Sequence, residues 1–557
     1  MISVILNWLY ITVTCYLTGF GVIKALSGIL TKTKKFRLND EIDYLYAGIG
    51  AVTVYAQFYS IFDGVGAGAN LGMLLICVLC IIVYRKELAE KLHTFRLTVT
   101  PGRVLLVGIL VLIFAYGTSF GIIHYDTGLY HAQSIRWIEE YGVVPGLGNL
   151  HTRLAYNSAA FCLSAIYSMA FLGGQSYHCV GGYLALLLIL LCTKAFRKER
   201  LLAPKLSDFV RLMGIYYLLM IFDEMVSPAS DYFMVLMVFY IVIRWLELLE
   251  KEETSYLPYG LLCLLCITVL TVKLSGALIL LLVLKPAVML LKEKKVREIF
   301  IFLGTGLIMV LPFLIRNVIL SGWLVYPFTS IDWFDVDFKI PKGVAEYDSR
   351  EIQVWGRGYS DVTRYDEPIS KWLPDWMRGL DTINLGFLAL AFLGLFILAG
   401  LFIYALLKKK SEMADYLHIA GVMTACFLFW LCSAPLIRYG CVFLWLMPVL
   451  IWGYVYLKFS PHTDRYKLYL IALILVSVYK LTAFSGEVAG SVTTDYLVFQ
   501  KDYDTFENIP YEIHGYTFYY PAEGDRTGYE DFPSAPLKKE DIFRGDSLEE
   551  GFISGET

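Results

Sequence analysis

The chain has 557 residues, of which 57% are hydrophobic and 17% are charged, and its formal net charge is −3. Soluble domains carry about 25% charged and about 45–50% apolar residues. Here the apolar residues come in nearly uncharged blocks of roughly 17–25 residues, the length that crosses about 30 Å of hydrocarbon as a helix. This pattern excludes a soluble enzyme, a disordered chain and an outer-membrane barrel, and the sequence has no basic patch for nucleic acid. It predicts an all-α polytopic membrane protein.

Fifteen apolar segments follow one another, beginning near residues 2, 44, 67, 104, 154, 177, 209, 231, 257, 275, 299, 385, 416, 441 and 468. The first has no small-residue cleavage site, so we interpret it as an anchor rather than a removable signal peptide. All 11 cysteines lie within these segments or at their ends. They are typical of lipid-buried cysteines, not of disulfides or metal sites.

Lys and Arg cluster in alternate loops, such as KTKKFR, RKERLLAPK and KEKKVR, and this bias places those loops in the cytoplasm. Counting 154–172 as a crossing would invert the pattern for the rest of the chain. This segment contains Asn157, Ser158 and Ser164, so we expect it to lie along or dip into the outer face without crossing. About 14 transmembrane helices result, with both termini outside. The outer loops and the tail are where chemistry that needs water belongs.

Asp126 stands two or three residues after the fourth apolar segment. The segment that follows has apolar residues on one helical face, namely Leu129, Ala132, Ile135 and Ile138. That is the pattern of a helix lying in the membrane interface. Asp126 is either the N-cap of this helix or a carboxylate that accepts a proton from an attacking hydroxyl. His124 and His131 lie nearby, but their spacing matches no zinc motif, so no metal site is predicted.

Three cations stand at the expected outer ends of apolar segments: Lys273 in TVKLSG, Arg316 in FLIRNVIL and Arg438 in SAPLIRYG. A charge within the membrane boundary costs a few kcal/mol, which marks it as a functional candidate. Either each cation pairs with a carboxylate such as Asp126 or Asp231, or together they bind an anion, for which a lipid-linked phosphate is suitable. Asp231, in SPASD, is alternatively only a helix cap.

Other charged and aromatic residues have simpler explanations. Arg244 and Lys285, near expected cytoplasmic ends, are interpreted as snorkelling cations. The loop 321–384 is rich in Trp and Tyr, which stack on sugars but also gather at every membrane interface. The tail mixes short β-like runs and turns and is expected to form a small α/β cap outside the membrane.

These motifs together resemble the GT-C class of membrane glycosyltransferases, which use polyprenyl-phosphate-linked sugars and are related in plan to protein O-mannosyltransferases and the lipid A aminoarabinose transferase. The matching places are YDTGLYH with Asp126, SPASD with Asp231, TVKLSG with Lys273, PFLIRNVILSGWLVYP with Arg316, and the pair Arg438–Tyr439. The resemblance covers about 104–457. It is strongest to a group of uncharacterised bacterial multispan proteins that share HYDTGLYH and RGDSLEEGF-like segments.

The resemblance implies a GT-C-like core over 104–457, with outer loops 124–176 and 321–384. Accessory helices at 1–103 would precede the core, and a last transmembrane helix at 458–486 and an extracytoplasmic tail at 487–557 would follow. The protein would lie in the bacterial cytoplasmic (inner) membrane, with its active face outside. Membrane lipids, a polyprenyl-phosphate-linked sugar and a glycan or lipid acceptor would be its partners.

The resemblance also implies an inverting transfer with Asp126 as the base. Lys273, Arg316 and Arg438 would hold the donor phosphate, and Tyr439, His131 and Asp231 would complete the substrate-binding set. No nucleotide cofactor is expected, and a divalent metal is left open. The alternatives are a polymerase or ligase of surface polysaccharide, with catalytic residues in loop 321–384, a lipid or polysaccharide transporter without catalysis, and a scaffold.

Overall fold

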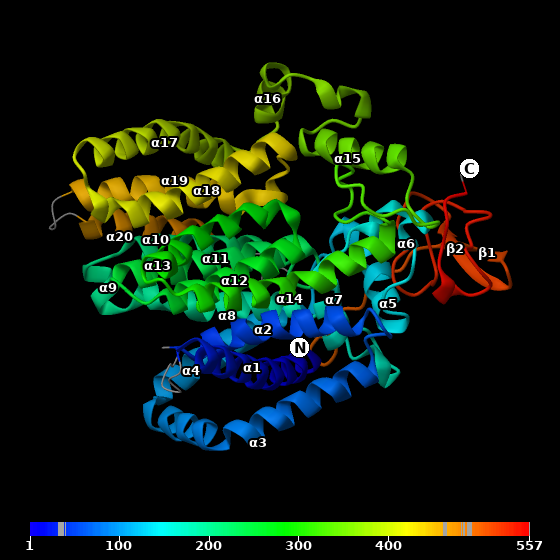
Figure 1. Ribbon diagram of the computed structural model, residues 1–557, viewed down its shortest axis with the longest axis horizontal. Helices are drawn as coiled ribbons and strands as arrows, with labels where there is room; N and C mark the ends of the chain where they lie inside the picture. The colour runs from blue at the N-terminus through cyan, green and yellow to red at the C-terminus, as the bar shows by residue number, and fades with distance from the viewer. Residues whose placement is uncertain are drawn as a thin grey trace.

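The computed structural model describes residues 1–31, 38, 40–460, 465–480, 482, 485–486 and 493–555. The chain is mostly helical, and its long helices run side by side along the longest axis of the molecule (Figure 1). Within the described residues, nine helical segments are long and apolar enough to cross a membrane. They are α1 (Ile2–Thr31), α3 (Ala67–Thr98), α4 (Pro101–Ser119), α11 (Ser230–Glu250), η5 with α13 (Leu274–Lys292), α14 (Val296–Ser321), α17 (Thr382–Leu407), η7 with α18 (Ser411–Ser433) and α19 (Ile437–Phe459).

Every other predicted apolar segment is also helical, but shorter or less apolar. These helices are α2 (Glu41–Tyr59), α7 (Ala159–Tyr167), α8 (Val180–Cys192), α10 (Leu206–Met220), α12 (Tyr256–Val272) and α20 (Arg465–Leu475). The expected multispan helical architecture is therefore present; nine helices of the described chain have the length and composition of a span, and the number of about 14 transmembrane helices stays a prediction. The remaining helices are α5 (Ala132–Glu140), α6 (Leu147–Leu150), α9 (Lys198–Leu202), α15 (Lys342–Gly356) and α16 (Ile369–Arg378).

Helix α11 forms the centre of the bundle. It packs against α8, α10, α12 and α19, and all but its last three residues are buried. Because its sequence is apolar on every side, a fully enclosed position is the one that it favours. The first three helices and helices α17–α19 lie on opposite sides of it (Figure 1).

Helix α7, within the segment that we expect not to cross, has only nine residues. At 1.5 Å per residue it spans about 14 Å, less than half of the hydrocarbon thickness. All nine residues are buried inside the protein, so α7 itself does not lie along the lipid surface. The Ser158 hydroxyl accepts a hydrogen bond from the Ala160 amide and caps the helix start.

The amphipathic segment after Asp126 forms a π-helical turn, η1 (Thr127–His131), and then α5. The prediction that its apolar face lies in the membrane interface is wrong, because seven of the nine residues of α5 are buried in protein. Helix α7 packs on one side. On the other, the Gln133 amide donates to the carbonyl oxygens of Gly528 and Asp531, both at 3.0 Å.

The tail forms a two-stranded antiparallel hairpin of β1 (Asn508–Ile513) and β2 (Tyr516–Pro521), with Asn508 opposite Pro521. His514 and Gly515 make the two-residue turn, and both have positive φ, as a primed hairpin turn requires. The amino group of Met1 donates to the Tyr496 carbonyl at 2.6 Å, so the chain begins beside the tail. We call this end of the bundle the tail end.

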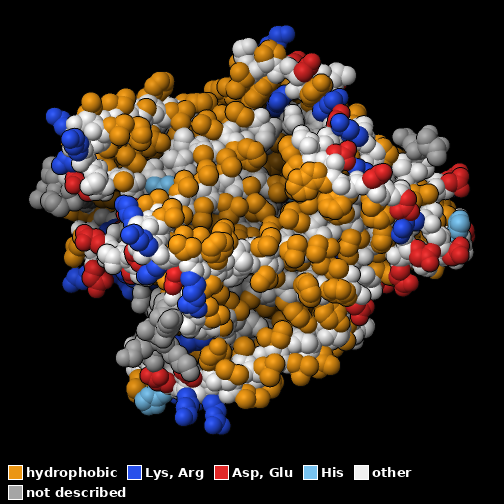
Figure 2. All heavy atoms as spheres, in the orientation of Figure 1, with side chains coloured by type: hydrophobic (Ala, Val, Ile, Leu, Met, Phe, Trp, Pro, Cys, Tyr) orange, Lys and Arg blue, Asp and Glu red, His pale blue; other side chains and the backbone are white. Residues whose placement is uncertain are grey.

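The opposite end of the bundle carries the loops between α8 and α10, between α13 and α14, and between α17 and α18. These loops contain RKERLLAPK, KEKKVR and KKK, so we call it the basic end. Figure 2 shows hydrophobic side chains across the middle of one face and charged side chains toward both ends. This distribution suits a bundle that crosses a membrane along its long axis.

Candidate functional site

A cavity of about 460 Å³ lies at the tail end of the bundle. Its walls come from the segment 126–161, the reversal between α12 and η5, the end of α14, helix α15, and the link between α18 and α19. Asp126, Lys273, Arg438 and Tyr439, which are far apart in the sequence, all line it. Its volume lies in the range of small-molecule sites.

Asp126 pairs with Arg438. Asp126 immediately precedes η1, but its side chain makes no cap hydrogen bond, so the N-cap interpretation is wrong. Its carboxylate instead accepts a hydrogen bond from the guanidinium of Arg438, at the start of α19. Burial raises the pKa of the Asp126 carboxyl, but Arg438, His131 and His124 together outweigh burial and hold this pKa below its ordinary value. Asp126 is therefore a carboxylate at neutral pH.

Asp231 and Lys273 form a second ion pair beside the first. Asp231 is the second residue of α11, and Lys273 lies in extended conformation where the chain reverses after α12. The Asp231 carboxylate also lies 3.9 Å from Nε of Arg438. The Lys273 ammonium sits 4.1 Å from the ring centre of Tyr439, a cation–π contact. Carboxylates and cations thus alternate, and Asp126, Asp231, Lys273 and Arg438 sum to zero charge.

Two buried donors at this cavity have no hydrogen-bond partner among the described residues. They are Nε of Arg438 and Nδ2 of Asn317, and both residues line the cavity. Buried polar groups in folded proteins are nearly always paired, so two unpaired donors on residues of the cavity wall are compatible with a ligand that accepts from them. The cation cluster is internally neutralised, and these two donors beside it lack partners.

His131 and His124 lie close to the Asp126–Arg438 ion pair. The His131 ring is buried, within 3.1 Å of the Thr127 hydroxyl, and does not line the cavity. Burial lowers its pKa to about 3, so it is neutral. His124 contacts Arg438, and burial and that guanidinium lower its pKa as well. Within the described part of the chain, no three His, Cys, Asp or Glu side chains are grouped to hold a metal ion.

Arg316 does not reach the cavity. Its guanidinium is buried within the bundle, where it donates to Oδ1 of Asn157 at 3.0 Å and to the Ser60 hydroxyl at 2.5 Å. On the same helix, Phe313, three residues earlier, and Asn317, the next residue, line the cavity instead. Of the three predicted phosphate ligands, the structure brings together Lys273 and Arg438. Arg316 instead binds Asn157, a residue of the cavity wall.

The profile of a family described as a domain of unknown function (DUF8201) matches residues 1–445. The chain belongs to this family. No curated protein and no solved structure matches it. The matched residues include the whole Asp126–Arg438–Asp231–Lys273 cluster, whereas the hairpin of the tail lies beyond them.

A second charged group on the cavity wall, within the part that matches the family, was missed by the sequence analysis. Arg153 lies 3.1 Å from Asp348 and 2.5 Å from Glu351, both on α15. The hydroxyls of Tyr156 and Tyr326 both donate to the Asp348 carboxylate. This group joins the first outer loop to loop 321–384. Arg153 is a cation on the expected outer side, so the reasoning that selected Lys273 also applies to it.

Proposed function

We propose that this protein is a membrane glycosyltransferase of GT-C type, which transfers a sugar from a polyprenyl-phosphate donor to a hydroxyl of a glycan or lipid acceptor. The proposal includes fourteen membrane crossings and a tail end that faces outward from the bacterial cytoplasmic membrane. One observation carries it: a single cavity at the tail end joins the carboxylate of Asp126 to the cations Lys273 and Arg438.

In this reaction the acceptor oxygen attacks the anomeric carbon of the sugar. A new glycosidic bond forms there, and the bond from that carbon to the phosphate oxygen breaks. The hydroxyl proton passes to the Asp126 carboxylate, which is ionised at neutral pH. The bond electrons leave with polyprenyl phosphate, whose developing charge is stabilised by Lys273 and by the free Nε–H of Arg438.

The Asp126–Arg438 pair suggests an order of binding. Without a substrate, the guanidinium occupies the carboxylate that must act as base. A donor phosphate that binds Arg438 competes for the same N–H groups and so releases the Asp126 carboxylate. Because Arg438 makes the largest contribution among the groups that lower the pKa of Asp126, its release makes the carboxylate a stronger base. Donor binding therefore prepares the site for the acceptor.

The apolar part of the cavity suits an isoprenoid chain. Leu274, Phe313, Phe429 and Leu436 line it on the side of the membrane-spanning helices. Phe429 belongs to α18, a candidate span, and 39% of its surface is exposed, so this side of the cavity opens toward lipid. A polyprenyl donor reaches the charged end from the bilayer by this route.

The alternative of a polysaccharide polymerase or ligase places its catalytic residues in loop 321–384. The arginines of that loop have local partners: Arg350 lies 3.5 Å from Glu346, Arg357 donates to the Tyr365 carbonyl, and Arg364 pairs with Glu367. None of these three arginines lines the cavity. This arrangement favours the site around Asp126.

The test is Asp126→Asn, which keeps the shape of the side chain and removes its basicity. We expect release of polyprenyl phosphate from polyprenyl-phosphate sugars, measured in proteoliposomes with membrane glycolipids as acceptors, to fall by about 100-fold or more. The matched control is Asp335→Asn, an exposed acid in loop 321–384, which should retain full activity. Thermal unfolding of both variants reports folding. An Asp126→Asn protein that folds and turns over normally would disprove the proposal.

A further inference from the structure

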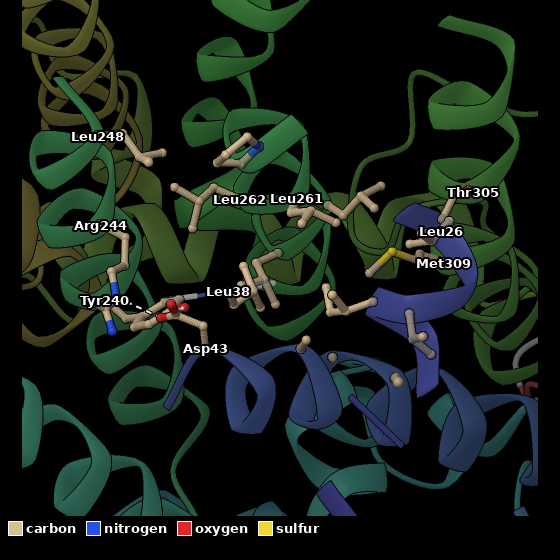
Figure 3. Close-up of a pocket in the computed structure, with 18 of the residues that line it drawn as sticks. Leu26, Leu38, Asp43, Tyr240, Arg244, Leu248, Leu261, Leu262, Thr305 and Met309 are labelled. Carbon is tan, nitrogen blue, oxygen red and sulfur yellow. Dashed lines mark hydrogen bonds and ion pairs between the residues drawn. The ribbon is translucent and has the colours of Figure 1, made fainter. Parts of the chain in front are cut away.

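A second cavity, of about 500 Å³, lies toward the basic end of the bundle, between α1, α2, α11, α12 and α14 (Figure 3). Its two ends differ in chemistry. Asp43, Tyr240 and Arg244 stand at one end, and Leu26 and Met309 lie at the other (Figure 3). The cavity is thus amphipathic along its length and lies far from the tail-end site.

The apolar part of this cavity opens toward lipid. Val22 on α1 and Ile308 on α14 both line it, and 39% and 66% of their surfaces are exposed. Both helices are candidate membrane spans, so the opening between them faces hydrocarbon rather than water. An occupant therefore enters from the bilayer with an apolar chain.

The charged end is built from buried, paired groups. Arg244, interpreted from the sequence as a snorkelling cation, is buried and lies 2.9 Å from Asp40, 2.7 Å from Asp43 and 2.5 Å from Glu247. The Tyr240 hydroxyl donates to Asp43 at 2.8 Å. Because three carboxylates already surround Arg244, this end of the cavity presents acceptor oxygens.

The rim adds a separate cation. Lys251, at the end of α11, is exposed, and Glu253 follows two residues later; both line the cavity. Among the described residues, the lining contains three carboxylates, Asp43, Glu247 and Glu253, and two cations, Arg244 and Lys251. A head group that fits has one phosphate, for Lys251, and one ammonium donor, for the carboxylates.

The depth of the cavity matches one leaflet of a membrane. Ile308 is twelve residues along α14 from Val296 at the basic end, a distance of about 18 Å. Half of the hydrocarbon core is about 15 Å. A lipid with its head at Lys251 therefore places an acyl chain along the apolar wall as far as Ile308.

We propose that this cavity binds one acyl chain of a zwitterionic aminophospholipid, such as phosphatidylethanolamine, with its phosphate at Lys251 and its ammonium at the carboxylates. The bound chain fills the space between α1–α2 and α11–α12 and so fastens the N-terminal helices to the rest of the bundle. The site is independent of the proposed transferase activity, because none of its residues lines the tail-end cavity.

The experiment compares lipid retention by the full chain. Protein is purified from nanodiscs of phosphatidylethanolamine, phosphatidylglycerol or phosphatidylcholine, and retained lipid is counted by native mass spectrometry. We expect one tightly held phosphatidylethanolamine and roughly tenfold less retention of the other two, equivalent to about 1.4 kcal/mol. Equal retention of the three lipids would overturn the head-group assignment.

Two substitutions test the location. Ala47→Phe fills the cavity from α2, and Lys251→Gln removes the rim cation; each should abolish the preference for phosphatidylethanolamine. The controls are Ala399→Phe on the exposed face of α17 and Lys292→Gln at the exposed end of α13, which should retain the lipid. Ala47→Phe protein that folds and still holds one phosphatidylethanolamine would place the lipid elsewhere and refute the site. If Ala47→Phe does not fold, retention by Lys251→Gln decides the question.

Discussion

At the scale of single residues, the cations on the expected outer side of the membrane were the most informative feature of the sequence. Lys273 and Arg438 both turned out to line one cavity, and each has a carboxylate partner there. The two interpretations of these cations, pairing and anion binding, are therefore compatible: pairing neutralises the resting site, and the unpaired Nε–H of Arg438 remains for a ligand.

Arg438 and Arg316 should respond differently to the same substitution. Arg438→Gln removes a cavity donor, so we expect the KM for the polyprenyl-phosphate donor to rise by about tenfold or more, from loss of a charge-assisted hydrogen bond. Arg316→Gln breaks the buried contacts to Asn157 and Ser60 and should cost about 1–3 kcal/mol of stability while leaving that KM unchanged. Donor kinetics and thermal unfolding of both variants provide the check. A raised KM in Arg316→Gln would restore its predicted role at the phosphate.

His178 makes the stability of the tail-end region sensitive to acid. Burial lowers its pKa to about 4, and its ring packs 4.6 Å from that of Tyr503 in the tail. The unfolded pKa is about 6.5, so the unfolded state takes up a proton first, and stability falls as pH drops from about 6.5 toward 4. The loss at pH 5 should be about 2 kcal/mol.

Thermal unfolding at pH 7 and pH 5 measures this effect. His178→Gln should reduce the acid-induced loss, because it removes the group that titrates. His93→Gln, at an exposed position on α3, should leave the pH dependence unchanged. An identical pH dependence in His178→Gln and the parent chain would contradict this explanation.

At the scale of elements, the apolar pattern of α5 predicts the helix correctly but its surroundings wrongly. Its apolar residues are on one face, as predicted, but that face packs in protein, and the polar face is covered by the tail. Asp126 is held at the head of this helix, so the packing of α5 also sets the position of the acid. The tail contributes to the site indirectly, by fixing the helix that carries Asp126.

Arg136 on α5 holds the tail through two backbone carbonyl oxygens. Its guanidinium donates to the carbonyl oxygen of Tyr529 at 2.8 Å and to that of Glu530 at 2.6 Å. Arg136→Ala removes both charge-assisted bonds, each worth about 1.5–3 kcal/mol. We expect amide exchange over residues 525–535 to accelerate by about tenfold or more, measured by hydrogen–deuterium exchange. Arg378→Ala, with a side chain 76% exposed, should not change it. Unchanged exchange in Arg136→Ala would mean that other contacts hold the tail.

At the scale of the whole molecule, the two cavities lie at opposite ends of one bundle, and α11 joins them. Asp231 at its start belongs to the tail-end site, and Arg244 near its other end belongs to the lipid site. The proposed topology places these ends on opposite sides of the membrane. Because Lys and Arg gather in the loops of one end, that end should face the cytoplasm.

Cysteine labelling tests this orientation. In a Cys432→Ser background, which removes the exposed native thiol, Asp335→Cys at the tail end should react with a membrane-impermeant maleimide in intact cells. Lys292→Cys at the basic end should react only after permeabilisation. The reverse pattern would invert the topology and exclude an outward-facing transferase site.

The sequence by itself determined where the helices lie and which cations are unusual, because both depend on local physics. A block of apolar residues buries itself as a helix wherever it occurs, and a charge at a membrane boundary is costly whatever its partner. The predicted segments near 2, 67, 299 and 441 accordingly form helices, and the predicted reversal is at Lys273.

Only the tertiary structure decided which side chains pair with these charged residues. The Asp126–Arg438 pair joins residues 312 positions apart, and nothing in either local sequence specifies the other. The same holds for Arg316, whose side chain is kept out of the cavity by the rotation of α14. It also holds for Arg244, whose three carboxylates come from two helices and a loop end. Apolar periodicity sets the existence of a helix, but its rotation and neighbours follow from packing over the whole bundle.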